Sequence, residues 1–224
     1  MYRKFFKRTF DVIISLSGLV CLAPLMFFVA LAIRIDSKGP AVFKSQRVGK
    51  NGKVFNCYKF RSMSIDAPNS EATRNIDSGL YITKVGRVIR KMSIDELPQL
   101  LNILKGEMAI IGYRPVVVTE TDLIEYRKEL GVDECLPGLT GLAQISGRDE
   151  LTDMQKKAII DATYCYNITF LNDCRIFFKT IGYVLTGKGI VEGSEPIKTK
   201  KSVVVLVTFK QSAAKGEKNI GIGA

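Results

Sequence analysis

The chain contains one long segment without a charged side chain, at residues 12–33. Coiled as an α-helix, these 22 residues would extend about 33 Å, which matches the hydrocarbon core of a bilayer. The segment is too long for the apolar core of a signal peptide, and no Ala-x-Ala cleavage site follows it. We therefore expect a membrane-embedded segment that is retained in the mature protein.

Basic residues flank this segment on both sides. Arg3, Lys4, Lys7 and Arg8 precede it, and Arg34, Lys38, Lys44 and Arg47 follow it. Because positive charge favours the cytoplasmic side of a membrane, both ends are predicted to face the cytoplasm. Pro24, near the centre, removes a helical hydrogen bond and can bend the chain back. A re-entrant helical hairpin broken at Pro24 satisfies both observations, and a single spanning helix is the alternative.

The composition limits the partners and the chemistry of the chain. A net charge of +11 beside a hydrophobic content of 46% predicts an anionic partner, which could be phospholipid, nucleotide phosphate or nucleic acid. The five cysteines are scattered without a CxxC spacing, which argues against a disulfide framework or a zinc site. Histidine is absent, so mechanisms that need an imidazole base are excluded.

Residues 93–115, SIDELPQLLNILKGEMAIIGYRP, combine two adjacent carboxylates with an apolar stripe. The stripe recurs at spacings of three and four and consists of Leu97, Leu100, Leu101, Leu104 and Met108, which predicts a helix with one buried face. Pro98 fits only near a helix start, so Asp95 and Glu96 are expected in the first turn. There the helix dipole would favour an ionised Asp95. Capping is the alternative role, because Ser93 and Glu96 have the spacing of a capping box.

This stretch resembles the signature of the bacterial sugar transferases, the monotopic polyprenyl-phosphate phosphoglycosyl transferases of the small, catalytic-domain-only type. Two further motifs follow the family's order, Tyr-Lys-Phe-Arg-Ser-Met at residues 58–63 and Pro-Gly-Leu-Thr-Gly with Ala-Gln and Gly-Arg at residues 137–148. The resemblance implies transfer of a sugar-1-phosphate from a UDP-sugar to undecaprenyl phosphate, with release of UMP. It further implies a place at the bacterial inner membrane, facing the cytoplasm, in the first step of capsule, exopolysaccharide or glycoconjugate assembly.

The resemblance assigns roles to particular residues. Asp95 would attack the phosphorus next to the sugar and form an aspartyl-phosphosugar intermediate, and Glu96 would assist it. Asp95 and Glu96 would also hold Mg²⁺, which binds carboxylates and substrate phosphates. The implied substrate-binding residues are Lys59, Arg87, Arg90, Arg114, Arg148 and Asp173. From local pattern alone, the basic residues could equally form solvated ion pairs, and Asp173 could be an exposed helix carboxylate.

The predicted fold is α+β, mostly helical with a short β-hairpin. Asn51-Gly52 is a turn signal between β-type runs at residues 41–43 and 54–60. Amphipathic helices are predicted at residues 116–130 and 170–185, and the latter could lie in the membrane interface. We divide the chain into a membrane-associated segment (1–38), a cytoplasmic catalytic domain (39–190) and a strand-like or disordered extension (191–224).

Two other functional classes agree with parts of the sequence. A membrane-tethered nucleic-acid binder would explain the basic charge, but the chain lacks a recognition-helix or basic-aromatic motif, so we expect no nucleic-acid partner. A non-catalytic scaffold of a polysaccharide assembly complex is the second alternative. The expected partners are a UDP-sugar, polyprenyl phosphate and the phospholipid bilayer, and the reading is compatible with downstream glycosyltransferases and with a homodimer.

Overall fold

The computed structural model describes residues 2–67, 78–146 and 154–186. Arg148 and the predicted C-terminal extension at residues 191–224 therefore lie outside the described residues. Within the described ranges the chain is mostly helical and carries two small β-sheets. This agrees with the predicted α+β class.

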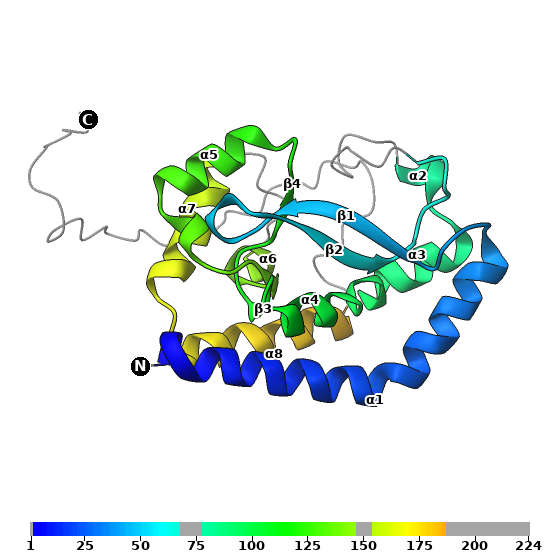
Figure 1. Ribbon diagram of the computed structural model, residues 1–224, viewed down its shortest axis with the longest axis horizontal. Helices are drawn as coiled ribbons and strands as arrows, with labels where there is room; N and C mark the ends of the chain where they lie inside the picture. Colours follow the sequence, from blue (N-terminus) through cyan, green and yellow to red (C-terminus); the bar gives the residue numbers. More distant parts are fainter. Residues whose placement is uncertain (1, 68–77, 147–153, 187–224) are drawn as a thin grey trace, which may run out of the picture.

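Helix α1 (Lys7–Asp36) follows a π-helical turn at Tyr2–Phe6 and includes the whole uncharged segment. It continues through Pro24 as one helix, so the predicted break into two half helices is wrong. A bent helix accommodates a proline at the cost of one hydrogen bond, and α1 bends in its C-terminal half (Figure 1). Asp11, Ser15 and Ile33 of α1 are buried, and Leu19, Met26, Val29 and Ala30 pack partly buried against the core. The exposed apolar side chains of α1, among them Val20, Phe27, Phe28 and Leu31, form the surface that is available to a membrane.

The predicted β-hairpin is confirmed. Strands β1 (Val42–Val48) and β2 (Val54–Phe60) pair antiparallel around a 3-10 turn at Lys50–Gly52. Asn51 occupies the left-handed region at φ 55°, as a tight turn requires. Strand β4 (Val116–Val117) adds to the free edge of β1.

Strand β4 corrects the helix predicted at residues 116–130. Val116 and Val117 pair with the hairpin and are buried, and only Thr121–Glu129 forms helix α5. β-branched residues fit a buried strand well. Tertiary pairing thus determines the conformation of a segment whose apolar spacing also suited a helix.

A second, parallel sheet joins β3 (Ala109–Ile111) to β5 (Gly138–Thr140). Its glycines allow very close backbone contact, because a Cβ on Gly138 would lie 2.1 Å from the nitrogen of Gly112. The core around this sheet contains Ile103, Met108, Tyr164 and Ile176, all fully buried. It is enclosed by α4 (Gln99–Lys105), α6 (Leu142–Ile145), α7 (Met154–Tyr166) and α8 (Phe170–Thr186), with a 3-10 turn at Val132–Glu134.

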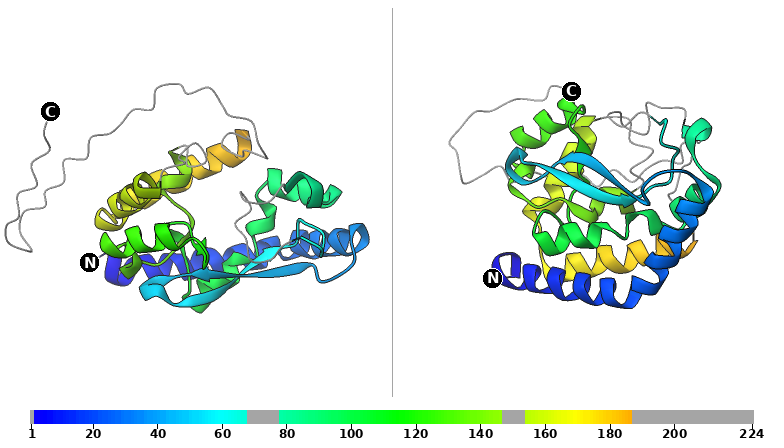
Figure 2. Two further views of the ribbon diagram at one scale, coloured as in Figure 1. Left: turned by 90° about the horizontal axis from the view of Figure 1, so that it is seen from above. Right: turned by 45° about the vertical axis from the view of Figure 1, so that its right-hand side comes forward.

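Helix α8 confirms the helix predicted at residues 170–185. It begins beside the start of α1, where the rings of Phe10 and Phe170 lie 5.7 Å apart, and then diverges from it (Figure 2). Its exposed apolar side chains include Phe170, Leu171, Phe178, Ile181 and Val184. Helices α2 (Ser78–Tyr81) and α3 (Lys84–Lys91) lie near the other end of α1 (Figure 1).

Candidate active site

The acid pair lies in a short 3-10 turn, Ile94–Glu96, which precedes α4. Ser93 adopts the left-handed conformation at φ 55° and makes no side-chain cap, so the capping box does not form. Pro98 is the N-cap of α4, and Gly106 ends that helix at φ 83°. The prediction that the acids occupy the first turn of one long helix is therefore wrong. They lie on a separate turn, which leaves their side chains available to contact other elements.

Glu96 is held by two cations from other parts of the fold. Its Oε1 accepts from Lys59 Nζ on β2 at 2.8 Å and lies 3.0 Å from an Arg114 guanidinium nitrogen. Burial alone would raise the pKa of Glu96, but the charges and hydrogen bonds of Arg114 and Lys59 outweigh it and hold that pKa well below its usual range. Glu96 is therefore a fixed carboxylate.

Asp95 lies in a different environment although it is the adjacent residue. No described residue donates a hydrogen bond to its carboxylate. Burial raises the pKa of Asp95, and the charge of Glu96 raises it further, against the opposing charges of Lys59, Arg114 and Arg90. We expected a helix N-terminus to favour the ionised form, and the structure reverses that direction. The protein therefore stabilises the anion of Asp95 less than it stabilises the anion of Glu96.

The predicted substrate-binding cations are only partly brought together. Lys59 and Arg114 contact Glu96 directly, and Arg90 on α3 acts on Asp95 through its charge. Arg87 lies on the exposed side of the same helix, and the structure gives it no contact with the acid pair. Thr83 caps α3 by accepting from the Gly86 N–H at 2.9 Å, which fixes the start of the helix that carries Arg90 and Arg87.

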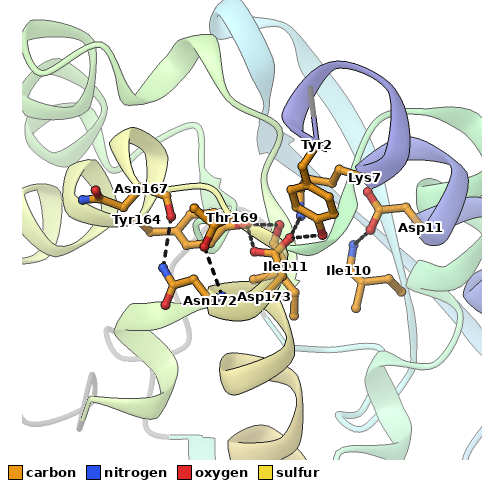
Figure 3. A network of polar contacts seen from close by, with 10 residues as sticks. All are labelled: Tyr2, Lys7, Asp11, Ile110, Ile111, Tyr164, Asn167, Thr169, Asn172 and Asp173. Carbon is orange, nitrogen blue, oxygen red and sulfur yellow. Dashed lines mark hydrogen bonds and ion pairs between the residues drawn. The ribbon is translucent and has the colours of Figure 1, made fainter.

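Asp173 belongs to a different, buried network, which Figure 3 shows. Its Oδ2 accepts from Tyr2 Oη at 2.8 Å and from Lys7 Nζ at 2.7 Å, and its Oδ1 lies 2.8 Å from Tyr164 Oη. These contacts join the start of α1 to α7 and α8. In this structure Asp173 links elements of the fold, and substrate binding by this residue stays a prediction.

Two residues to which the sequence analysis gave no role contact the segments that surround the acid pair. Arg47 on β1 places Nη1 3.5 Å from the carbonyl oxygen of Pro115, next to Arg114. Asn102 on α4 is fully buried and connects α4 to β2, because its side chain accepts from Tyr58 N–H and donates to the Asn56 carbonyl. The hairpin register could have identified Arg47 as a candidate site residue, since Arg47 and Lys59 lie on the same face of the hairpin.

A cation site built by the protein alone would need more ligands than this cluster offers. Among the residues that the structure describes, no group of three acidic, histidine or cysteine side chains could hold a metal ion. Asp95 and Glu96 provide two carboxylates, a set that suits an ion whose remaining ligands are substrate phosphates and water. Mg²⁺ fits that description.

The model of the family described as "Bacterial sugar transferase" matches residues 2–187. The chain is 42% identical over 204 residues to the "Undecaprenyl-phosphate galactose phosphotransferase" of Salmonella typhimurium, an alignment that covers 83% of this chain and 42% of that protein. It is 40% identical over 198 residues to the "Exopolysaccharide production protein ExoY" of Sinorhizobium fredii, covering 82% of this chain and 87% of ExoY.

A third relative, an "Uncharacterized sugar transferase" of Haemophilus influenzae, is 38% identical over 201 residues, which cover 82% of this chain. The chain spans about two fifths of the length of the Haemophilus and Salmonella proteins. The matched region contains the acid pair, the hairpin and the apolar N-terminal helix, and helices α7 and α8 up to Thr186. The chain belongs to the bacterial sugar transferase family.

Proposed function

We propose that this protein transfers a sugar-1-phosphate from a UDP-sugar to undecaprenyl phosphate through a covalent intermediate on Asp95. The observation that carries the proposal is the different environment of the two adjacent acids. Glu96 is paired at 2.8 and 3.0 Å, whereas Asp95 lacks a hydrogen-bond donor among the described residues and is destabilised as an anion by burial. A nucleophile needs a reactive oxygen that is not already bonded, and Asp95 fits that role.

The first half-reaction needs no proton transfer. A carboxylate oxygen of Asp95 forms a bond to the sugar-proximal phosphorus, the bond from that phosphorus to the bridging oxygen breaks, and UMP leaves with the electron pair. In the second half-reaction an oxygen of undecaprenyl phosphate attacks the same phosphorus and the Asp95 carboxylate leaves. The ionised form of Asp95 and the phosphate of the acceptor attack without a general base, which agrees with a chain that has no histidine.

Lys59, Arg114 and Arg90 support this chemistry by their charge. Phosphoryl transfer depends chiefly on positioning and on neutralisation of the phosphate oxygens. Lys59 and Arg114 also fix Glu96, so that the acid pair is held against the hairpin. Mg²⁺ held by Asp95 and Glu96 would neutralise further charge on the diphosphate.

The location of the acid pair suits one water-soluble and one membrane-bound substrate. Helix α1 is long and apolar enough to enter a bilayer, and α8 exposes an apolar face. The matching proteins in Salmonella and Sinorhizobium carry names that refer to undecaprenyl phosphate and to exopolysaccharide production. We therefore propose a bacterial inner-membrane protein, facing the cytoplasm, in the first step of polysaccharide or glycoconjugate assembly, with α1 re-entrant at its bend.

A donor-only experiment tests the covalent step. Purified protein with Mg²⁺ and a panel of UDP-sugars, without acceptor, should release at most one UMP per protein and gain the mass of the phosphosugar on Asp95. Asp95→Asn should abolish both signals, whereas Asp122→Asn, an exposed carboxylate on α5, should leave both unchanged. UMP release that requires the acceptor, or an adduct on another residue, would exclude the proposed intermediate.

A further inference from the structure

The face of the hairpin that carries Lys59 also carries a second cation, Arg47. In the register of β1 with β2, Phe43 lies opposite Lys59 and Arg47 lies opposite Phe55. Opposite residues of antiparallel strands share a face, as do alternate residues along one strand. Arg47 and Lys59 therefore point to the same side of the hairpin, the side where Lys59 contacts Glu96.

The hydrogen-bond partners of Arg47 within the described residues are neutral groups, so they do not balance its positive charge. Its Nε donates to Ser45 Oγ at 3.1 Å, and Nη1 lies 3.5 Å from the Pro115 carbonyl oxygen, at the limit of a hydrogen bond. Among the described residues it forms no ion pair. Arg127 provides the contrast within the same protein, because two of its nitrogens contact Asp161 at 2.6 and 2.9 Å. A half-buried guanidinium without a carboxylate suggests that its anion comes from outside the protein.

The electrostatic surroundings of Arg47 agree with this. Burial lowers the pKa of Arg47, and the nearby positive charge of Arg114 lowers it further, against the weaker opposing effects of Cys57, Glu120 and Glu96. An arginine nonetheless stays charged in proteins. Arg114 has Glu96 as its carboxylate partner at 3.0 Å, whereas Arg47 contacts only neutral groups among the described residues. A phosphate group could accept from Arg47 and Arg114 at once.

We propose that Arg47 is a phosphate-binding residue that acts together with Arg114 at the acid pair. This rests on the proposed function, which supplies two sources of the phosphate, the diphosphate of the UDP-sugar and the terminal phosphate of the polyprenol. Arg47 binds its ligand through the edge of the guanidinium that Ser45 and Pro115 do not contact. It contributes binding and orientation of the phosphate, and no proton transfer.

Binding of inorganic pyrophosphate and of UMP, in the presence of Mg²⁺, tests the proposal without turnover. Titration calorimetry on the full chain in detergent should show that Arg47→Gln weakens pyrophosphate binding by about 10- to 100-fold, as expected for loss of a hydrogen bond to a charged group. Lys44→Gln is the matched control, because Lys44 is an exposed cation on the same strand. Equal affinity of Arg47→Gln and wild type, or an equal loss in Lys44→Gln, would overturn the proposal.

Arg47→Lys covers the case in which Arg47→Gln does not fold. It keeps the charge and loses the planar fork, so binding should weaken by about 3- to 10-fold, and an unchanged dissociation constant would refute phosphate binding. The KM values of Arg47→Lys then distinguish the two sources, since either the KM for UDP-sugar or the KM for polyprenyl phosphate should rise. If both stay at wild-type values, the proposal fails.

Failure of the proposed function gives a different result. Wild-type protein would then bind pyrophosphate with the help of Arg47 but release no UMP from any UDP-sugar.

Discussion

The contrast between Asp95 and Glu96 predicts opposite effects of two isosteric substitutions on stability. Glu96→Gln leaves Lys59 and Arg114 without their shared anion, and breaking a buried ion pair costs about 3–5 kcal/mol. Because the side chains are 17–30% exposed, solvent screening reduces this cost, and we expect a loss of about 2–3 kcal/mol. For a chain of this size that corresponds to a fall in Tm of about 4–12 °C.

Asp95→Asn should leave Tm unchanged or raise it. Because burial raises the pKa of Asp95, the folded protein binds this proton more tightly than the unfolded chain does. Stability therefore falls as pH rises through the interval between the unfolded and folded pKa values, and the ionised side chain costs stability at neutral pH. The neutral amide of Asp95→Asn removes that cost. The gain in stability of the variant over the wild type should therefore shrink as the pH is lowered. The pH dependence of stability due to Glu96 has the opposite sign. Its stabilising contribution is present at neutral pH and is lost only as pH falls below about 4.3.

Thermal unfolding in detergent, followed by circular dichroism at pH 7.5 and pH 5, measures both effects. Glu129→Gln on the exposed side of α5 is the control and should shift the free energy of unfolding by less than about 0.5 kcal/mol. A fall in Tm for Asp95→Asn as large as that for Glu96→Gln would contradict the assignment of one acid to structure and the other to chemistry. So would a Glu96→Gln protein as stable as the wild type.

Three further predictions follow from the structure. In the donor-only reaction, the single-turnover rate of UMP release should fall as pH drops through the pKa of Asp95, which burial raises. An acid limb of that rate at or below the ordinary aspartate value of about 3.9 would be evidence against Asp95 as the nucleophile. Gly86→Ala should destabilise the protein by about 3 kcal/mol and reduce activity, because the new Cβ would lie 2.0 Å from the Ser62 carbonyl oxygen. A wild-type Tm by calorimetry would contradict this prediction, because it would mean that α3 can move away from Ser62 without cost. The chain has no tryptophan, so a Phe178→Trp variant carries a single fluorescent indole on α8. Brominated phospholipid in nanodiscs should quench its fluorescence, whereas the fluorescence of Tyr126→Trp on α5 should not be quenched. Equal quenching of the two would exclude α8 as the membrane-facing helix.

Local signals in the sequence predicted the elements that local physics determines. The hairpin follows from Asn51-Gly52 between two β-type runs, and the long apolar helix follows from the absence of charge over residues 12–33. Neither depends on contacts with distant segments. The break at Pro24 was wrong because a proline costs a helix one hydrogen bond and a bend, which a long helix can absorb.

The surroundings of the acid pair could not be predicted because they are tertiary. The left-handed backbone of Ser93 separates the acids from α4, and no local residue preference predicts that conformation for a serine. Burial of Asp95 depends on how the 3-10 turn packs against β2 and α3. The same holds for Asp173, whose partners Tyr2 and Lys7 are more than 160 residues away in sequence.

The contacts between α1 and α4 connect the long apolar helix to the acid pair. Arg8, at the start of α1, donates to the carbonyl oxygens of Ile103 and Leu104 at 2.6 and 3.0 Å, at the C-terminal end of α4, where the helix dipole favours a cation. Further along α1, Gly18 lets α4 approach closely, because a Cβ there would lie 3.2 Å from Leu100 Cδ1. Helix α4 is therefore held at two points by the helix that would lie in the bilayer. Since the acids precede α4 by a few residues, the packing of these two helices would set their distance from a bilayer that holds α1, as the proposed function requires.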